Sequence, residues 1–345
     1  MAATGTVVGA QAASLPLPPV DEVVPGVWVL PVPIPINPLR YVLVHALQVG
    51  DSLVLIDAGW DTTEAWDALG AGLAEVGATV ADVAGVLVTH LHPDHYGLAG
   101  RIRDASGCWV ALHPADAALL ADRYIHIDDL VEATRDVLVE AGVPADEVGA
   151  LATASVEVRE FVALAEPDIL IEDGSRVDLP GWELTAIHTP GHTPGHLCFR
   201  ENRLHIVFTG DHVLPRITPN VSYHPQSGPD PLGDYLRSLE RVRGESDVLA
   251  LPAHEWRFHG LAARVDELLR HHEQRLNEIT DIAAAGAQTA WEVAQRLSWS
   301  RPWDRIEGFM RRMAVAEVHA HLLLLERRGV LARIGDRPAR WSPPT

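Results

Sequence analysis

Thr89-His90-Leu91-His92-Pro93-Asp94-His95-Tyr96-Gly97 places three imidazoles and one carboxylate within six residues. The stretch directly follows the apolar run Gly85–Val88, which is typical of a short buried strand. Side chains at a strand end and in the turn after it can converge on one point of a rigid scaffold. Nitrogen-rich ligand sets with one carboxylate are typical of zinc or iron, whereas calcium and magnesium prefer oxygen. The stretch therefore predicts a metal site, and the alternative is a surface loop rich in histidine.

Three further ligand candidates lie in the second half of the chain, near strand-like runs. His192 lies in Thr189–His196, whose paired Pro-Gly turns would hold an imidazole on a tight loop. Asp211 follows the run ending at Phe208, and His254 follows Val248–Ala253. His196 could support the ligands from behind, since it lies four residues past His192. The candidate ligands are therefore His90, His92, Asp94, His95, His192, Asp211 and His254.

The pattern from Val27 to Leu112 alternates strands with helices, which favours a sheet covered by helices. Asp61 and Glu64 form a capping-box pattern that predicts a helix running to about Val76. Residues 114–167 are helical in pattern, acidic and Ala-rich, so we expect two or three inserted helices that form a structural cap or a wall of the substrate pocket. A stretch spaced by prolines is expected to lie outside any sheet: Pro31, Pro33, Pro35 and Pro38.

The region after Leu261 reads as mostly helical and carries little net charge, in contrast to the acidic region before it. A long helix to about Ala285, a capping box at Thr289–Glu292, a third helix near 306–328 and a terminal hairpin follow the order of a winged helix. The pattern predicts an N-terminal arm (1–20), a catalytic domain (21–260) and a winged-helix-like domain (261–345).

The 345 residues carry a net charge of −20, and every basic residue is Arg. An acidic surface repels phosphate backbones, so nucleic acid is a disfavoured partner and a small-molecule substrate is favoured. No apolar run reaches the roughly 20 residues that span a bilayer. The first 20 residues lack the basic start of a secretory signal, so we expect a cytoplasmic protein. Cys108 and Cys198 are then expected to be reduced. A homodimer is an open alternative to a monomer.

The ligand candidates, in this order and each near a strand end, resemble the metallo-beta-lactamase superfamily. Asp57 in Leu55–Gly59 matches that superfamily's first motif, an aspartate that orders the loops beneath the metals. The resemblance covers about Val27 to His259 and implies an α/β fold, an αββα sandwich with metals at one edge between two sheets. The tail resembles the winged-helix segment of the lactamase-beta-like branch, most of all around Thr289–Ala294. The resemblance implies one metal on His90, His92 and His192, a second on Asp94, His95 and His254, and Asp211 bridging both.

Two divalent metal ions, zinc foremost with iron or manganese as alternatives, are the cofactors that this resemblance implies. A water shared by two such ions loses a proton near neutral pH and becomes a hydroxide nucleophile. Asp94 and Asp211 would then be catalytic as well as metal-binding, and Asp94 could pass a proton to the leaving group. Tyr96 adjoins the ligands and could donate to an oxyanion, or it could simply pack against the inserted helices.

The leading function is a metal-dependent hydrolase of thioesters, esters or lactones, similar to glyoxalase II. Glyoxalase II binds glutathione through a cluster of basic residues. In this chain the local candidates for such a cluster are Arg123, Arg135 and Arg159 of the inserted helices. The alternatives are a single-strand endoribonuclease or other phosphodiesterase, an iron-dependent dioxygenase, and a winged-helix regulator that binds nucleic acid. That last alternative would use arginines of the third C-terminal helix, namely Arg311, Arg312, Arg327 and Arg328.

Overall fold

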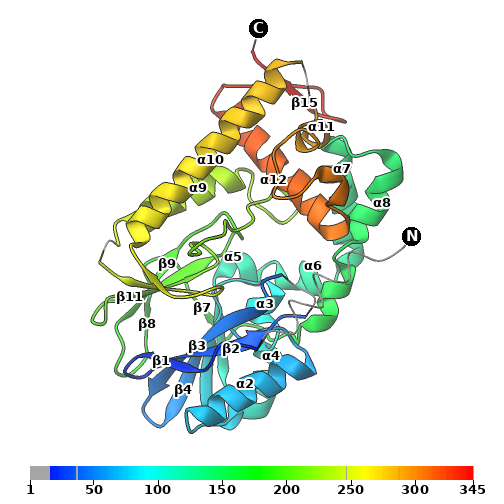
Figure 1. The fold of residues 1–345 in the computed structure, drawn as a ribbon. Helices are drawn as coiled ribbons and strands as arrows, with labels where there is room; N and C mark the ends of the chain where they lie inside the picture. Colours follow the sequence, from blue (N-terminus) through cyan, green and yellow to red (C-terminus); the bar gives the residue numbers. More distant parts are fainter. Residues whose placement is uncertain (1–15, 36–37, 246, 287, 345) are drawn as a thin grey trace.

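The computed structural model describes residues 16–35, 38–245, 247–286 and 288–344, so most of the expected N-terminal arm (1–20) lies outside the described residues. Two β-sheets face each other and carry helices on their outer faces (Figure 1). The first sheet runs in the order β1 (Asp21–Val24), β2 (Val27–Pro33), β3 (Tyr41–Val49), β4 (Ser52–Ile56), β5 (Val83–Leu87), β6 (Trp109–Leu112) and β7 (Ile169–Leu170). The second sheet runs β13 (Phe258–His259), β12 (Leu249–Pro252), β11 (Ile206–Gly210), β10 (Leu197–Glu201), β9 (Leu184–His188) and β8 (Arg176–Val177).

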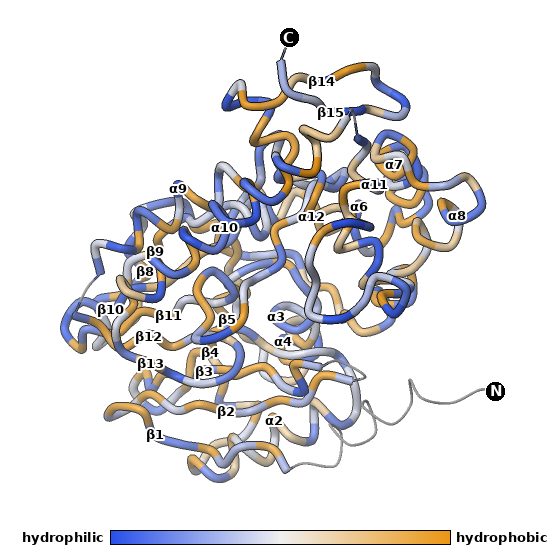
Figure 2. Tube along the Cα trace, turned by 45° about the horizontal axis from the view of Figure 1, so that its top comes forward, coloured by the Kyte–Doolittle hydropathy of each residue, from blue (hydrophilic) through white to orange (hydrophobic). Residues whose placement is uncertain are grey.

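Buried apolar side chains fill each space between the layers. Residues such as Ile56, Leu87 and Phe208 form the core between the two sheets. A second core joins the other face of the first sheet to α2 (Thr63–Glu75) and α4 (Ala99–Ser106). Figure 2 shows the apolar residues gathered along the strands, as a sheet buried on both faces requires. The layers confirm the expected αββα sandwich.

The outer face of the second sheet packs on α9 (Pro231–Arg243) and α10 (Leu261–Ala284). This core continues without a break into the C-terminal elements, which follow in the predicted order. These elements are α11 (Ala290–Ala294), the 3-10 helix η3 (Trp303–Arg305), α12 (Gly308–Arg327), β14 (Ala332–Ile334) and β15 (Arg340–Ser342). The capping box expected at Thr289 and Glu292 is present. Assignment to the winged-helix class stays a prediction.

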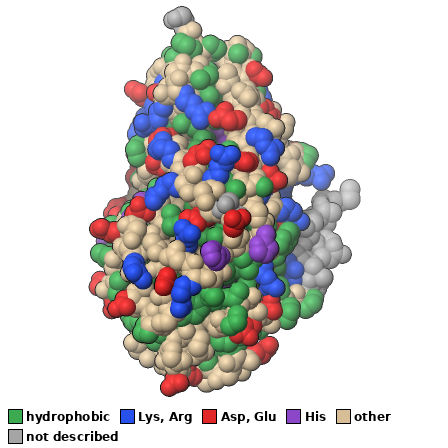
Figure 3. Space-filling model, turned by 90° about the vertical axis from the view of Figure 1, so that its left-hand side faces the viewer, with side chains coloured by type: hydrophobic (Ala, Val, Ile, Leu, Met, Phe, Trp, Pro, Cys, Tyr) green, Lys and Arg blue, Asp and Glu red, His purple; other side chains and the backbone are tan. Residues whose placement is uncertain are grey.

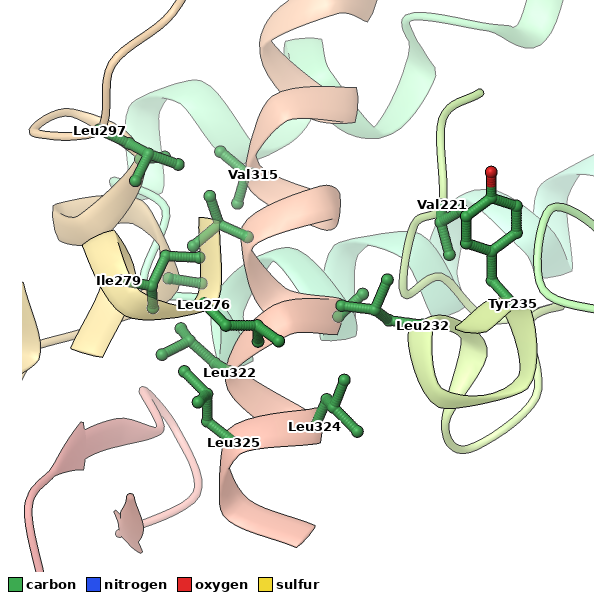
Figure 4. Close-up of a cluster of buried hydrophobic side chains, with 14 of the residues drawn as sticks. Val221, Leu232, Tyr235, Leu276, Ile279, Leu297, Val315, Leu322, Leu324 and Leu325 are labelled. Atoms are coloured by element: carbon green, nitrogen blue, oxygen red, sulfur yellow. The ribbon is translucent and has the colours of Figure 1, made fainter. Parts of the chain in front are cut away.

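The inserted stretch 114–167 packs against the C-terminal helices instead of forming a separate cap. It is divided into α5 (Pro114–Ala117), α6 (Leu120–Tyr124), α7 (Ile127–Glu140), α8 (Ala145–Thr153) and the 3-10 helix η2 (Val156–Phe161), more and shorter pieces than expected. Figure 4 shows the middle of α12 at the centre of the shared core, where Leu322 and Val315 lie beside Ile279 of α10. Backbone hydrogen bonds from Trp291 and Ala339 to α7 and its C-terminal end tie the two parts together.

Two local expectations are wrong. Pro31 and Pro33 lie inside β2, paired with Leu43 and Tyr41 of β3. They are tolerated because β1 pairs with β2 only as far as Val29, which leaves this part of β2 as a sheet edge. Helix α2 is capped by Thr62, whose side chain accepts a hydrogen bond from Ala65 N–H, and not by Asp61.

Cys108 and Cys198 are buried and free, as expected. No helix in the described part of the chain has the length and apolar character needed to cross a membrane. The expected cytoplasmic location and the homodimer stay predictions.

Candidate metal centre

The ends of parallel strands bring the predicted ligands to one edge of the sandwich. β4 runs parallel to β5, and β11 runs parallel to β12, so their carboxyl ends meet at the same edge. Asp57 follows β4, the Thr89–Gly97 stretch follows β5, Asp211 follows β11, and His254 lies two residues past the end of β12. The short helix α3 (Pro93–Tyr96) then carries two further candidates on one turn.

All seven predicted ligands lie together in the structure. Their candidate ligand atoms fall into overlapping groups in which all atoms lie within 4.8 Å of one another. Asp211 lies between the two sides, because its Oδ1 is 3.2 Å from His254 Nε2 and its Oδ2 is 3.5 Å from His192 Nε2. The groups are His90, His92 and His192; His90, His95 and Asp211; and Asp94, His95 and His254.

Three of the imidazoles are oriented so that their Nε2 atom is left for a metal. His95 Nδ1 lies 2.7 Å from Asp57 Oδ2, His192 Nδ1 lies 2.7 Å from the Asn220 carbonyl oxygen, and His254 Nδ1 lies 3.0 Å from the Tyr41 carbonyl oxygen. In the neutral imidazole, donation of the Nδ1 proton to these oxygens leaves Nε2 unprotonated and able to bind a metal. In the described part of the chain, the three Nε2 atoms and Asp211 Oδ1 are buried without a hydrogen-bond partner. Buried polar atoms rarely stay unpaired, so this donor set fits divalent metal ions.

The electrostatics divide the histidines into two kinds. Burial, reinforced by neighbouring imidazoles, holds the pKa of His90 and of His92 well below the ordinary value. Burial also lowers the pKa of His95, but the carboxylates of Asp57, Asp94 and Asp211 outweigh it and raise that pKa well above the ordinary value. The site therefore concentrates negative charge on the Asp94 side, where a cation is favoured.

Asp57 holds the first loop in place. It has a left-handed backbone with φ of 65°, which is strained for an aspartate. Its Oδ1 accepts hydrogen bonds from Thr89 N–H at 2.8 Å and from the Thr89 hydroxyl at 2.9 Å, while Oδ2 orients His95. The structure thus gives Asp57 the loop-ordering position that the sequence motif implies.

Asp116 of α5 is a site residue that sequence reasoning missed. Its buried carboxylate accepts hydrogen bonds from Leu91 N–H at 2.9 Å, from the Thr193 hydroxyl at 2.8 Å and from Gly195 N–H at 2.6 Å. It therefore joins the loop of His90 and His92 to the loop of His192. Gly195 permits the approach, since a Cβ there would lie 2.6 Å from Asp116 N. The only signal in the sequence is an acid just after a strand-like run.

An Asp116→Ala variant is expected to lose about 1–3 kcal/mol of unfolding free energy, because three buried donors lose their acceptor. Its metal affinity is expected to fall about 10- to 100-fold, since the two ligand loops are no longer held together. Urea unfolding and metal titration measure these effects, with Asp116→Asn as an isosteric comparison of intermediate effect. Native metal affinity in Asp116→Ala would contradict this positioning role.

The expectation that Tyr96 donates to an oxyanion is wrong. Its ring is buried, and its hydroxyl hydrogen-bonds the backbone of Ala165, donating to the carbonyl and accepting from N–H. Burial raises the pKa of Tyr96 to about 12. The side chain packs beneath the end of the insertion, and its hydroxyl proton is already donated within the protein.

His196 supports the ligands from behind. It is fully buried, its Nε2 accepts a hydrogen bond from Asp211 N–H at 3.1 Å, and its Nδ1 lies 2.8 Å from the Thr189 hydroxyl. It therefore fixes the backbone of the central carboxylate. Gly210 makes room for this contact, because a Cβ there would lie 2.7 Å from His196 Nε2.

The ligand cluster opens into a cavity of about 520 Å³, lined in part by His92, Asp94 and His192. A family model described as the metallo-beta-lactamase superfamily matches residues 38–254, a range that contains the whole ligand set. The chain belongs to the metallo-beta-lactamase superfamily. That fold implies divalent metal ions at this centre.

Several known proteins resemble the chain over most of its length. The crystal structure of a metallo-beta-lactamase family protein from Thermus thermophilus has a TM-score of 0.82 and 32% identity, covering 94% of this chain and 100% of that one. A Beta-lactamase domain protein from Burkholderia ambifaria shares the fold, with a TM-score of 0.76 and 24% identity, covering 94% of this chain and 95% of that one. "Probable metallo-hydrolase YqjP" of Bacillus subtilis (strain 168) is 28% identical over 264 residues, 74% of this chain and 80% of that protein.

Proposed function

We propose that the protein is a metallo-hydrolase that cleaves a thioester, ester or lactone bond with the help of two divalent metal ions, zinc foremost. The observation that carries the proposal is a set of seven buried or partly buried candidate ligands beside a cavity, three of which, His95, His192 and His254, have an Nε2 atom without a hydrogen-bond partner among the described residues. Two groups of ligands lie on either side of Asp211, which supports two ions in place of one. The relative named a probable metallo-hydrolase supports the same reaction class.

The reaction needs an activated water and a group to handle its proton. Divalent ions at the centre would supply Lewis acidity and lower the pKa of a coordinated water. Asp94 reaches the cavity, with 14% of its side chain exposed, and its Oδ2 lies 3.4 Å from His254 Nε2. Burial raises the pKa of Asp94, but His95 and His254 outweigh it and lower that pKa. Asp94 is therefore charged, and its position suits it to accept a proton from the nucleophile and pass it to the leaving group.

The cavity supports a small organic substrate. Its volume of about 520 Å³ lies within the range of roughly 300–1,000 Å³ that is typical of small-molecule sites. Apolar side chains from the insertion and from α12, including Leu130, Val137 and Met313, form much of its wall. Acyl chains and aromatic bodies suit such a wall, whereas a ribose-phosphate chain does not.

The surface does not favour nucleic acid. Acidic and basic side chains are interspersed on the face drawn in Figure 3 and do not gather into a basic patch among the described residues there. Arginines of α12 and its C-cap are already bonded within the protein: Arg311 to Glu147 at 3.0 Å, Arg328 to Glu273 at 2.8 Å, and Arg327 to the Pro229 carbonyl oxygen. Because these groups are bonded internally, they offer few phosphate contacts.

The proposal predicts about two zinc-like ions per chain and turnover of at least one thioester, ester or lactone. Metal analysis of the purified protein is combined with a panel of thioesters, esters, lactones and phosphodiesters. One iron per chain with oxygen uptake, or cleavage of phosphodiesters alone, would overturn the proposal. A chain without Asp211, made as Asp211→Ala, is the inactive control for the panel.

A further inference from the structure

Helix α12 forms part of the cavity lining. Phe309, Arg312, Met313 and Ala316, all on α12, line the same cavity as His92 and His192 of the metal centre. The Tyr223 N–H donates to the Ala316 carbonyl oxygen at 3.0 Å, which ties α12 to the loop after Asp211. The C-terminal segment is thus a wall of the substrate site.

Two arginines in this cavity are bonded to neutral partners. Arg312 Nη2 donates to Ser155 Oγ at 2.8 Å, and the guanidinium lies over the Phe309 ring, 5.1 Å from its centroid. Arg123 Nη1 donates to Gln226 Oε1 at 3.0 Å. Within the described ranges, neither guanidinium lies in an ion pair with a carboxylate. Neighbouring Arg311, by contrast, is paired with Glu147 at 3.0 Å.

These two charges are unfavourable for the fold alone. Burial, aided by repulsion from Arg123, lowers the pKa of Arg312 to about 10. Burial and the charges of both arginines together lower the pKa of His224, another cavity residue, to about 3. A partly buried cation without a counterion destabilises a protein, so these two groups are better explained by a ligand than by packing.

Both arginines line the cavity that the candidate metal ligands His92, Asp94 and His192 also line. A guanidinium presents a planar set of N–H donors that matches a carboxylate or a phosphate. An anionic group held there would lie in the same cavity as the bond presented to the metals.

We propose that the cavity takes an amphipathic acid, in which Arg123 and Arg312 bind a carboxylate or phosphate while an apolar body lies along the inserted helices and α12. The apolar body would contact Leu130, Val131, Val137, Val158, Phe309 and Met313. The inference rests on the proposed function for placing the scissile bond at the metal centre. It adds the substrate class: an acyl compound that has an apolar body and also carries an anionic group.

Calorimetric titration of the metal-loaded full chain with octanoate, octyl phosphate and 1-octanol tests this inference. The Arg312→Met and Arg123→Met variants are each expected to bind both anions at least about tenfold more weakly than the native chain. Octanol affinity should be the same in every chain. Arg327→Met is the matched control, because Arg327 lies on the same helix, outside the cavity lining, and bonds the Pro229 carbonyl oxygen. The anion that binds more tightly identifies the anionic group.

Urea unfolding of the same variants separates ligand binding from structure. Arg312→Met is expected to be as stable as the native chain or more so, because it removes a charge without a counterion. Native affinity for both anions in Arg312→Met and Arg123→Met would overturn the inference. Arginine-dependent binding in a chain that hydrolyses no member of the substrate panel would uphold the ligand class and contradict the hydrolase proposal. Hydrolysis of neutral acyl compounds alone, with no arginine-dependent binding, would uphold the hydrolase proposal and contradict the ligand class.

Discussion

An Asp94→Ala variant is expected to lose about 1,000-fold or more in kcat/KM on any substrate that the native chain hydrolyses. Such a loss corresponds to about 4 kcal/mol of transition-state stabilisation. Two effects add up here, because Asp94 is both a candidate ligand beside His254 and His95 and the carboxylate that reaches the cavity. Metal content should fall from about two ions per chain to about one.

The controls for this prediction separate charge from shape. Asp94→Asn keeps the side-chain volume but loses the negative charge, so its rate should fall nearly as far as that of Asp94→Ala. Asp67→Ala removes an exposed carboxylate of α2, far in sequence from every ligand, and should leave the rate unchanged. Steady-state kinetics with metal analysis of each variant provides the measurement. A rate within tenfold of native in Asp94→Ala would contradict a direct role for this carboxylate.

Removal of the metal ions is expected to lower the melting temperature of the protein by roughly 5–10 °C. A ligand present at 1,000 times its dissociation constant stabilises the folded state by about 4 kcal/mol. The metal-free centre also leaves His95 Nε2, His192 Nε2 and Asp211 Oδ1 buried without a hydrogen-bond partner among the described residues, which is unfavourable. Calorimetry before and after chelation, and after zinc is added back, gives the size of the effect.

A variant that lacks the central carboxylate provides the comparison for metal removal. Asp211→Ala cannot join the two ligand groups, so its melting temperature should respond little to chelator or to added zinc. The native chain should recover its original melting temperature when zinc is restored. If chelation leaves the native melting temperature unchanged, the cluster does not bind metal in the folded protein.

The ligand set could be predicted from the sequence because its signal is local. Histidine and aspartate stand directly after short apolar runs, and strand ends are where a sheet brings distant side chains together. Asp116 carries only a weak form of this signal, since it lies four residues after the end of β6. Its partners are two backbone N–H groups and the Thr193 hydroxyl, which belong to two loops that meet only in the folded chain. Tyr96 shows the opposite error: its place beside the ligands is local, but the direction of its side chain depends on how the insertion packs.

The layered architecture was also predictable, whereas the packing of its appended parts was not. Alternating strands and helices favour a sandwich. The expectation that proline lies outside sheets fails at Pro31, because the sequence does not show which strand segments form sheet edges. From the sequence, Arg312 is one of four candidate phosphate contacts of a winged-helix regulator. The structure places it in the lining of the cavity beside the ligand cluster, because the apolar face of α12 packs on α10 and the insertion.

Two of the segments that line the cavity, α7 with its neighbours and α12, are far apart in the chain. They are joined by the ion pair between Arg311 and Glu147 at 3.0 Å and by the hydrogen bond from Arg312 Nη2 to Ser155 Oγ at 2.8 Å. A chimera that takes only one of these segments from a relative would lose the contacts between the two segments, and the shape of the cavity would change. Substrate preference should therefore pass from one relative to another, by engineering or in evolution, only when both segments change together.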